Sequence, residues 1–245
     1  MTDPNAPDRQ AASTRSHPNP KLDRLRLPST IDSSNPYYCM MRWGLRFLLP
    51  TFWKARVYGR HNEPSEGGVV YISNHQSFLD PMLVGFGLVR PLNYMARSTL
   101  FDTPGLNQLM SSLNAFPVKR GTADTGALKE AMRRIKRGGQ VLVFAEGTRT
   151  KNGRIAPFLP GVSLLAQRAA QWIVPVVIDG AFEAWPRTQS LPSLGEDIVV
   201  SFGKAIPQEE ARKFKSAPLV EHIRQKIIQL QTDVRQRQGR PELKY

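Results

Sequence analysis

The chain has 245 residues, with 34 lysines and arginines against 20 aspartates and glutamates, so its formal net charge is +14. This length allows one catalytic domain with a sizeable core, and the single cysteine, Cys39, excludes an internal disulfide and suits a reducing compartment. The positive charge suits an anionic membrane, the phosphates of CoA, an acidic carrier protein or nucleic acid.

Two different segments precede the expected domain. Residues 1–36 are rich in Pro, Ser, Asn and Asp and hold few apolar side chains, which predicts a disordered tail. They also lack the apolar core of a secretory signal.

Residues 37–58 place large apolar side chains such as Trp43 and Phe47 beside cations such as Arg42 and Arg46. No uncharged run here approaches the ~18–20 residues of a spanning helix. The pattern favours amphipathic helices that associate with an anionic membrane surface, with Pro50 kinking the segment or dividing it into two helices. The alternative is an N-terminal helix packed on the sheet.

Apolar runs and amphipathic stretches alternate through residues 59–232, which predicts an α/β domain whose largely parallel central sheet is flanked by helices. Strands are expected at 68–73, 115–119, 140–144, 173–178 and 197–202, and helices near 81–89, 105–112, 124–137, 161–170 and 218–237. The basic residues 233–245 are expected to form a solvated C-terminal tail.

A histidine and an aspartate follow the first of these strands, in the run from Asn74 and His75 to Asp80 and Pro81. Asp80 is suited to hold one imidazole nitrogen, which leaves the other free to take a proton from an alcohol. On one regular helix, positions five apart differ by roughly 140°, so we expect His75 in the loop and Asp80 as the N-cap of the next helix. The alternative is a loop histidine beside a structural cap.

A second polar run, Glu146, Gly147, Thr148 and Arg149, ends the strand 140–144. Glycine lets backbone N–H groups approach a ligand closely, and a planar guanidinium suits phosphate. These residues predict a cradle for an anionic oxygen. The alternative is a tight turn with a solvated arginine.

Weaker signals lie at three other strand or helix ends. Lys119 and Arg120 stand at the end of the strand 115–119 and suggest a further phosphate contact, although ordinary surface charge is the alternative. Gly161 ends a proline-rich turn that opens a helix, and Pro175 lacks a ladder donor, which favours an edge or a bulge. The histidines other than His75 have no partners at metal-ligand spacing, so no metal site is predicted.

Taken in order, these segments resemble the motif set of glycerolipid acyltransferases, and most closely the bacterial lysophosphatidic acid acyltransferases. The resemblance covers roughly residues 55–205 and rests on Asn-His-x-x-x-x-Asp at 74–80, Lys-Arg-Gly at 119–121, Phe-Ala-Glu-Gly-Thr-Arg-Thr at 144–150 and Val-Pro-Val at 174–176. The chain departs from the family pattern at three positions. Asn114 replaces a frequent glycine, Ala145 replaces the usual proline, and Leu159 stands where a lysine is common.

The resemblance implies transfer of an acyl group from acyl-CoA or acyl carrier protein to the hydroxyl of lysophosphatidic acid, in phospholipid biosynthesis. It makes His75 the general base and Asp80 its partner, and it places the acceptor phosphate among Arg120, Gly147, Thr148 and Arg149, with Lys119 nearby. Glu146 is left with two roles, binding a glycerol hydroxyl or ordering Arg149, while Asn74, Gly161 and Pro175 support the site.

No cofactor and no metal are expected, and the protein is expected at the cytoplasmic face of the membrane, peripheral or monotopic. The alternatives are another lysolipid or glycerol phosphate as the acceptor or, from a different class, a basic nucleic-acid-binding module. No zinc spacing or RNA-binding signature supports a nucleic-acid partner.

Overall fold

The computed structural model describes residues 35–119 and 124–245. Its centre is an eight-stranded sheet in the order β1-β7-β6-β2-β5-β3-β4, with β8 also paired to β6. The strands are β1 (Arg56–Tyr58), β2 (Val69–Ser73), β3 (Leu92–Arg97), β4 (Ala115–Val118), β5 (Gln140–Phe144), β6 (Trp172–Asp179), β7 (Val199–Phe202) and β8 (Ile206–Pro207). Only β6 with β7 and β6 with β8 pair antiparallel among the described strands, so the expected largely parallel sheet is confirmed.

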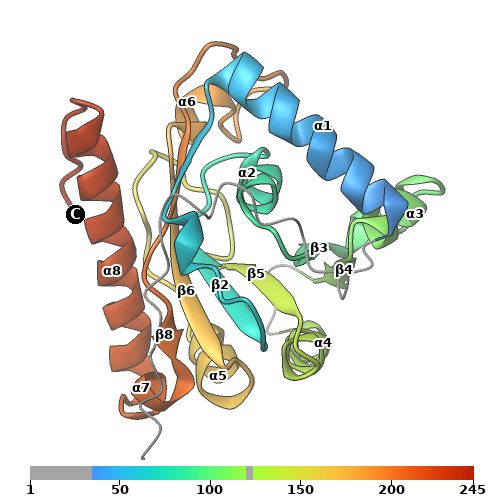
Figure 1. Ribbon diagram of the computed structural model, residues 1–245, viewed down its shortest axis with the longest axis vertical. Helices are drawn as coiled ribbons and strands as arrows, with labels where there is room; N and C mark the ends of the chain where they lie inside the picture. The colour runs from blue at the N-terminus through green and yellow to red at the C-terminus, as the bar shows by residue number, and fades with distance from the viewer. Residues whose placement is uncertain (1–34, 120–123) are drawn as a thin grey trace, which may run out of the picture.

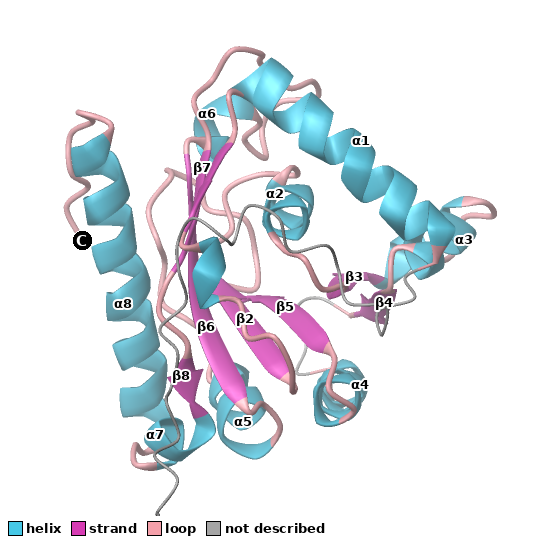
Figure 2. Cartoon of the chain, in the orientation of Figure 1, coloured by secondary structure: helices cyan, strands magenta, loops and turns pink. Residues whose placement is uncertain are grey.

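Helices cover both faces of this sheet (Figure 1). One face packs against α4 (Thr125–Lys136), α5 (Gly161–Arg168) and α8 (Ser216–Arg237), and the other against α2 (Asp80–Gly87), with α1 (Pro36–Trp53) outside it (Figure 2). Shorter helices are α3 (Leu106–Ser112), α6 (Ala181–Ala184), α7 (Gln208–Arg212) and two 3-10 turns, Arg60–Asn62 and Ser98–Leu100. The arrangement is a three-layer α/β fold.

Strand β2 shows why its sequence is continuously apolar. Val70 and Ile72 pack into the core beneath α4, α5 and α8, whereas Val69 and Tyr71 pack into the core beneath α1 and α2. A strand buried on both faces has no polar alternation. In register, Ser73 at the end of β2 pairs with Phe144 of β5 and with Val176 of β6. The loops after β2 and β5 therefore leave the sheet side by side, where ligand sites of open α/β sheets form.

The segment 37–58 differs from the prediction. It forms one helix, α1, followed by strand β1, so the expected division into two helices at Pro50 is wrong. Pro50 lies in the last turn of the helix, three residues before its end at Trp53, and its missing N–H removes one intrahelical hydrogen bond. Within the described residues, no helix is both long enough and apolar enough to cross a membrane.

The arginines of α1 point to α2. Arg46 donates to the carbonyl oxygens of Leu88 (2.9 Å) and Phe86 (3.3 Å), and Arg42 donates to that of Val89. These carbonyls lie at and just beyond the C-terminal end of α2, where cations and donors are favourable. The cations expected to interrupt the apolar surface of α1 instead join α1 to α2.

The C-terminal residues are also more ordered than expected. Helix α8 continues to Arg237, and the side chains of Val234 and Arg235 are buried. Arg235 and Arg240 donate to the carboxylate of Asp179, which is fully buried at the end of β6. The prediction of a solvated tail at 233–245 is therefore wrong for Val234 and Arg235, whereas Gln236, Arg237 and Pro241 are exposed.

Pro175 lies in the interior strand β6 and not at a sheet edge. On one side β6 pairs with β2, and on the other it pairs first with β8 and then with β7. Pro175 lies between those two antiparallel ladders, and its carbonyl accepts from the backbone N–H of Gly203 at 2.8 Å. The missing N–H of proline therefore costs no ladder bond, which explains its place inside the sheet.

Candidate active site

His75 and Asp80 meet in the structure. His75 lies in the loop after β2, and its Nδ1 is 2.7 Å from Oδ2 of Asp80. The same oxygen accepts the backbone N–H groups of Gln76 (2.5 Å) and Ser77 (2.8 Å). Asp80 is the first residue of α2 and Leu79 the N-cap, so the expected N-cap role of Asp80 is wrong by one position. The carboxylate instead folds back over its own loop, which brings together two residues that a regular helix would separate.

The imidazole is held on two sides. Its ring stacks on Phe144, the last residue of β5, with centroids 4.0 Å apart and planes at 12°. The His75 side chain is almost fully buried, and its Nε2 makes no hydrogen bond with a described residue. Because Asp80 occupies Nδ1, a neutral imidazole with its proton there presents Nε2 as the free base.

Buried amides fix the loop that carries His75. The Asn74 side chain exchanges two hydrogen bonds with the backbone of Ile178 in β6, at 2.8 and 2.9 Å. Gln76 donates to the carbonyl of Gly153 at 3.1 Å and accepts from the backbone N–H of Ala181 at 3.2 Å. The sequence analysis assigned Asn74 a supporting role but missed Gln76, whose signal was a polar side chain inside a loop between buried elements.

Glu146 lies behind His75. Its Oε1 accepts the backbone N–H of His75 at 2.9 Å, and its Oε2 accepts that of Ala156 at 3.1 Å. Burial raises the pKa of Glu146 to about 7, against the opposing effect of these two backbone N–H groups. Both oxygens of Glu146 therefore accept backbone N–H groups. The sequence analysis considered binding of a glycerol hydroxyl or ordering of Arg149, and neither role includes these backbone contacts.

The next three residues continue the turn, and Arg149 among them is half-buried. Gly147 has φ +70°, a left-handed conformation, and a Cβ there would lie 2.6 Å from Cδ1 of Leu159. Thr148 is exposed, and the Arg149 guanidinium lies over the Phe78 ring at 3.4 Å from its centroid. Phe78 belongs to the His75 loop and is itself exposed, so this contact joins the two predicted motifs.

The remaining predicted residues lie elsewhere. Lys119 follows β4, three strand spacings or roughly 14 Å from β2, its side chain is exposed and its backbone N–H donates to Asp124. Arg120 lies outside the described residues. Gly161 begins α5, and a Cβ there would meet no atom within 4 Å. Across the described ranges, no three His, Cys, Asp or Glu side chains are grouped to hold a metal ion.

The sequence that builds this site matches a known protein family. The family model described as Acyltransferase matches residues 54–179. A chloroplastic 1-acyl-sn-glycerol-3-phosphate acyltransferase of Brassica napus is 33% identical over 147 residues, which are 59% of this chain and 42% of the relative. A Bacillus subtilis 1-acyl-sn-glycerol-3-phosphate acyltransferase is 25% identical over 196 residues, covering 78% of this chain and 96% of the relative.

A solved structure shares the fold. The crystal structure of the 1-acyl-sn-glycerophosphate acyltransferase PlsC from Thermotoga maritima superposes with a TM-score of 0.65 and 22% identity, covering 78% of this chain and 75% of that one. The chain spans less than half the length of the chloroplastic relatives from Brassica napus and Arabidopsis thaliana. The family match covers the His75–Asp80 loop, the Glu146–Arg149 turn and the strands that carry them, and the chain therefore belongs to the acyltransferase family.

Proposed function

We propose that this protein transfers a fatty acyl group from a thioester to the free hydroxyl of 1-acyl-sn-glycerol-3-phosphate, which forms phosphatidic acid. The observation that carries the proposal is the contact between His75 Nδ1 and Asp80 at 2.7 Å, which leaves Nε2 as the free nitrogen. The names of the relatives from Brassica napus and Bacillus subtilis support the same acceptor.

The chemistry follows from this dyad. His75 Nε2 accepts the hydroxyl proton while the hydroxyl oxygen attacks the thioester carbonyl, and Asp80 stabilises the imidazolium that forms. The tetrahedral intermediate then expels the thiolate, which takes the proton from His75 and leaves as the thiol. No covalent acyl-enzyme and no metal or cofactor is needed, and the donor is acyl-CoA or acyl carrier protein.

The acceptor phosphate is assigned to the exposed turn beside the dyad. Thr148 and Arg149 present a hydroxyl and a guanidinium, and Gly147 leaves the backbone open to close approach. Lys119 and Arg120 were predicted to add to this cradle, but Lys119 follows β4, three strands away from β2, and Arg120 lies outside the described residues. Fixing the acceptor near Nε2 is itself catalytic, since positioning removes much of the entropic barrier.

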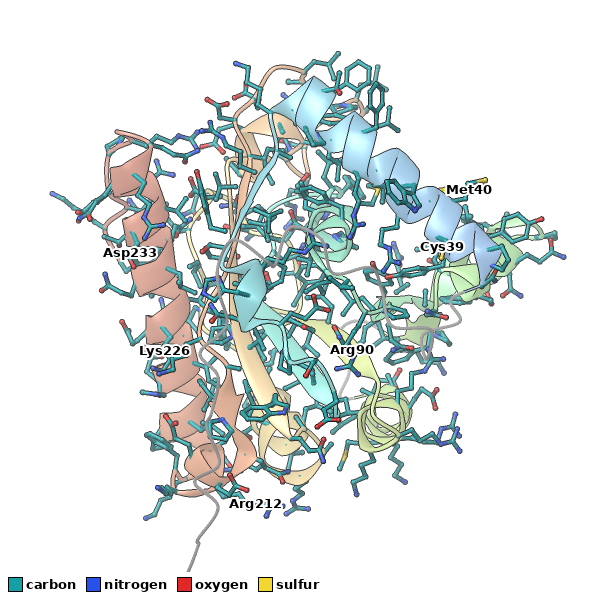
Figure 3. The ribbon with its side chains drawn as sticks, viewed as in Figure 1. Cys39, Met40, Arg90, Arg212, Lys226 and Asp233 are labelled. Carbon is teal, nitrogen blue, oxygen red and sulfur yellow. The ribbon has the colours of Figure 1, made fainter. Side chains whose placement is uncertain are left out.

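Helix α1 is proposed to lie on the cytoplasmic face of a membrane. Its exposed side carries Trp43 (69% exposed) and Phe47 (71%), while Arg42 and Arg46 are used to hold α2. Figure 3 labels Met40 on the outer side of the same helix. Exposed Leu194 continues this surface, because the next residue, Gly195, donates its N–H to the carbonyl of Phe52. A continuous apolar face of this kind suits a lipid interface.

The activity is tested by thiol release from palmitoyl-CoA with lysophosphatidic acid in detergent micelles. His75→Ala should lose acceptor-dependent release by about 10²- to 10⁴-fold, whereas His61→Ala, at an exposed histidine of a 3-10 turn, should keep it. Near-wild-type turnover in folded His75→Ala contradicts the general-base role. Release only with a different lysolipid or with glycerol phosphate replaces the proposed acceptor.

The membrane contact is tested by co-sedimentation with anionic vesicles. Trp43→Ser combined with Phe47→Ser should weaken binding, because it removes two large apolar side chains from the interface. Lys226→Ser on α8, which lies on the opposite side of the sheet (Figure 1), should leave binding unchanged. The reverse pattern would move the lipid contact to the α8 side.

A further inference from the structure

Arg224 of α8 reaches the polypeptide next to the site from the other side of the sheet. Its Nε donates to the carbonyl of Ala156 at 3.2 Å and its Nη2 to that of Ile155 at 3.1 Å, while Nη1 pairs with Glu221 at 3.1 Å. Only 16% of the Arg224 side chain is exposed. Helix α8 lies outside the residues that match the family model, so this contact is a feature of the chain beyond that match.

One peptide group, between Ile155 and Ala156, contacts both Arg224 and Glu146. Its Ile155 carbonyl accepts from Arg224 Nη2 at 3.1 Å, and its Ala156 N–H donates to Glu146 Oε2 at 3.1 Å. The other carboxylate oxygen accepts the backbone N–H of His75 at 2.9 Å. An unbroken series of hydrogen bonds therefore runs from α8 through residues 155–156 and Glu146 to the main chain of His75.

We propose that Arg224 is a positioning residue, which acts through Ala156 and Glu146 to hold the backbone of His75 where the imidazole faces its substrate. The catalytic consequence of this inference rests on the proposed function. The series of hydrogen bonds from Arg224 to the backbone of His75, called the brace below, is present whether or not the protein turns over a substrate. Fixing a general base in this way matters because small displacements of a reacting group cost large factors in rate.

The positive charge of Arg224 also favours the ionised form of Glu146, which accepts both N–H groups. The titratable side chains that face Glu146 are Asp80 on the His75 loop, Arg224 on α8 and Tyr245 near the end of the chain. Burial raises the pKa of Glu146, the Asp80 charge adds to that rise, and Arg224 opposes it. Removing the Arg224 cation should raise the pKa of Glu146 further, so that the carboxylate that accepts both N–H groups persists only at higher pH.

The kinetic test compares Arg224→Gln, Arg224→Lys and a control, Lys226→Gln, in the full chain. Lys226 is an exposed residue of α8, labelled in Figure 3, and makes no ion pair with a described residue. Arg224→Gln should lower kcat about tenfold, as expected for losing hydrogen bonds to a charged group, with KM for both substrates little changed. It should also move the acid limb of the pH–kcat profile to higher pH. Arg224→Lys should return that limb toward wild type, because it keeps the charge.

Other kinetic outcomes overturn the proposal. An unchanged kcat and pH profile in folded Arg224→Gln would show that the brace does not reach His75. A rise in the KM for the acceptor alone would make Arg224 a substrate contact, because uniform binding appears in KM. An equal loss in Lys226→Gln would point to a general effect of charge on α8.

Amide hydrogen exchange separates this inference from the proposed function. The backbone N–H groups of His75 and Ala156 should exchange about tenfold faster in Arg224→Gln, since local opening is governed by such hydrogen bonds, and should be unchanged in Lys226→Gln. If wild type releases no thiol, the proposed function fails. Amide hydrogen exchange still shows whether Arg224 holds the backbone of His75 and Ala156.

If Arg224→Gln does not fold, Arg224→Lys decides the comparison by exchange alone. Lysine keeps the charge but lacks the guanidinium fork that donates to two carbonyls, so the His75 and Ala156 amides should still exchange faster than in wild type, and wild-type exchange overturns the proposal.

Discussion

Two aspartates near neighbouring strand ends, Asp80 and Asp179, are both fully buried but differ in the charges around them. Asp179 at the end of β6 accepts from Arg235 (2.9 Å), Arg240 (3.0 Å) and Gln231 (2.8 Å). Asp80 accepts from the His75 ring and two backbone N–H groups, and its Oδ1 has no hydrogen-bond partner among the described residues.

The difference fits the proposed function, in which the two carboxylates have different roles. Asp179 is neutralised by two permanent cations, so it cross-links β6 to α8 and to the residues after it. No arginine or lysine pairs with Asp80 in the described part of the chain, so its charge remains available to stabilise a positive charge that appears on His75. A buried carboxylate with fixed cations suits structure, whereas one facing a histidine suits proton transfer.

The largest expected effect is on catalysis at Asp80. Asp80→Asn should lower kcat by about 10³- to 10⁴-fold, because an amide neither stabilises the imidazolium nor fixes the same tautomer. The free energy of unfolding should change far less, since an amide oxygen can still accept the N–H groups of Gln76 and Ser77. Thiol-release kinetics and urea denaturation on the same preparation measure both quantities. Wild-type kcat in Asp80→Asn would show that Asp80, like Asp179, has no part in catalysis.

Asp179→Asn should show the opposite profile. It leaves Arg235 buried without its anion, which should lower the free energy of unfolding by about 3 kcal/mol, while kcat of the folded protein stays near wild type. Urea denaturation gives the first quantity and thiol release the second. Adding Arg235→Gln should restore part of the stability by removing the uncompensated charge. A tenfold loss of kcat without loss of stability would instead place Asp179 in the catalytic machinery.

Glu146, the third buried carboxylate, gives a smaller effect that depends on pH. Its pKa in the folded protein is about 7, above the unfolded value of 4.5, so the folded state binds more protons between these values. This contribution to stability is fully present below about pH 4.5 and is lost as pH rises through 7. Between pH 5 and 8 it amounts to roughly 2 kcal/mol.

The pH effect is measured by urea denaturation of wild type and Glu146→Gln across that range at constant ionic strength. Glu146→Gln should remove most of the fall in stability between pH 5 and 8, since glutamine does not titrate. An identical fall in both proteins would assign the titration to another group.

Local sequence patterns determined the parts of this protein that depend on near neighbours. Strands β2, β5 and β6 are apolar runs because they are buried on both faces, and their expected positions are confirmed within one residue at each end. The polar runs at 74–80 and 146–149 were both predicted to follow strands, and the structure brings them together at one edge of the sheet by stacking His75 on Phe144.

Contacts between residues distant in sequence decided the features that local patterns did not predict. Strand β3 mixes Asn93, Tyr94 and Arg97 with apolar residues and was not predicted, because its pairing with β4 and β5 defines it more than its composition does. Composition alone suggested that Arg46 would meet lipid and Arg235 solvent, yet one caps α2 and the other neutralises Asp179. A charged side chain is placed by whichever buried carbonyl or carboxylate the fold brings to it, and only the tertiary structure supplies that partner.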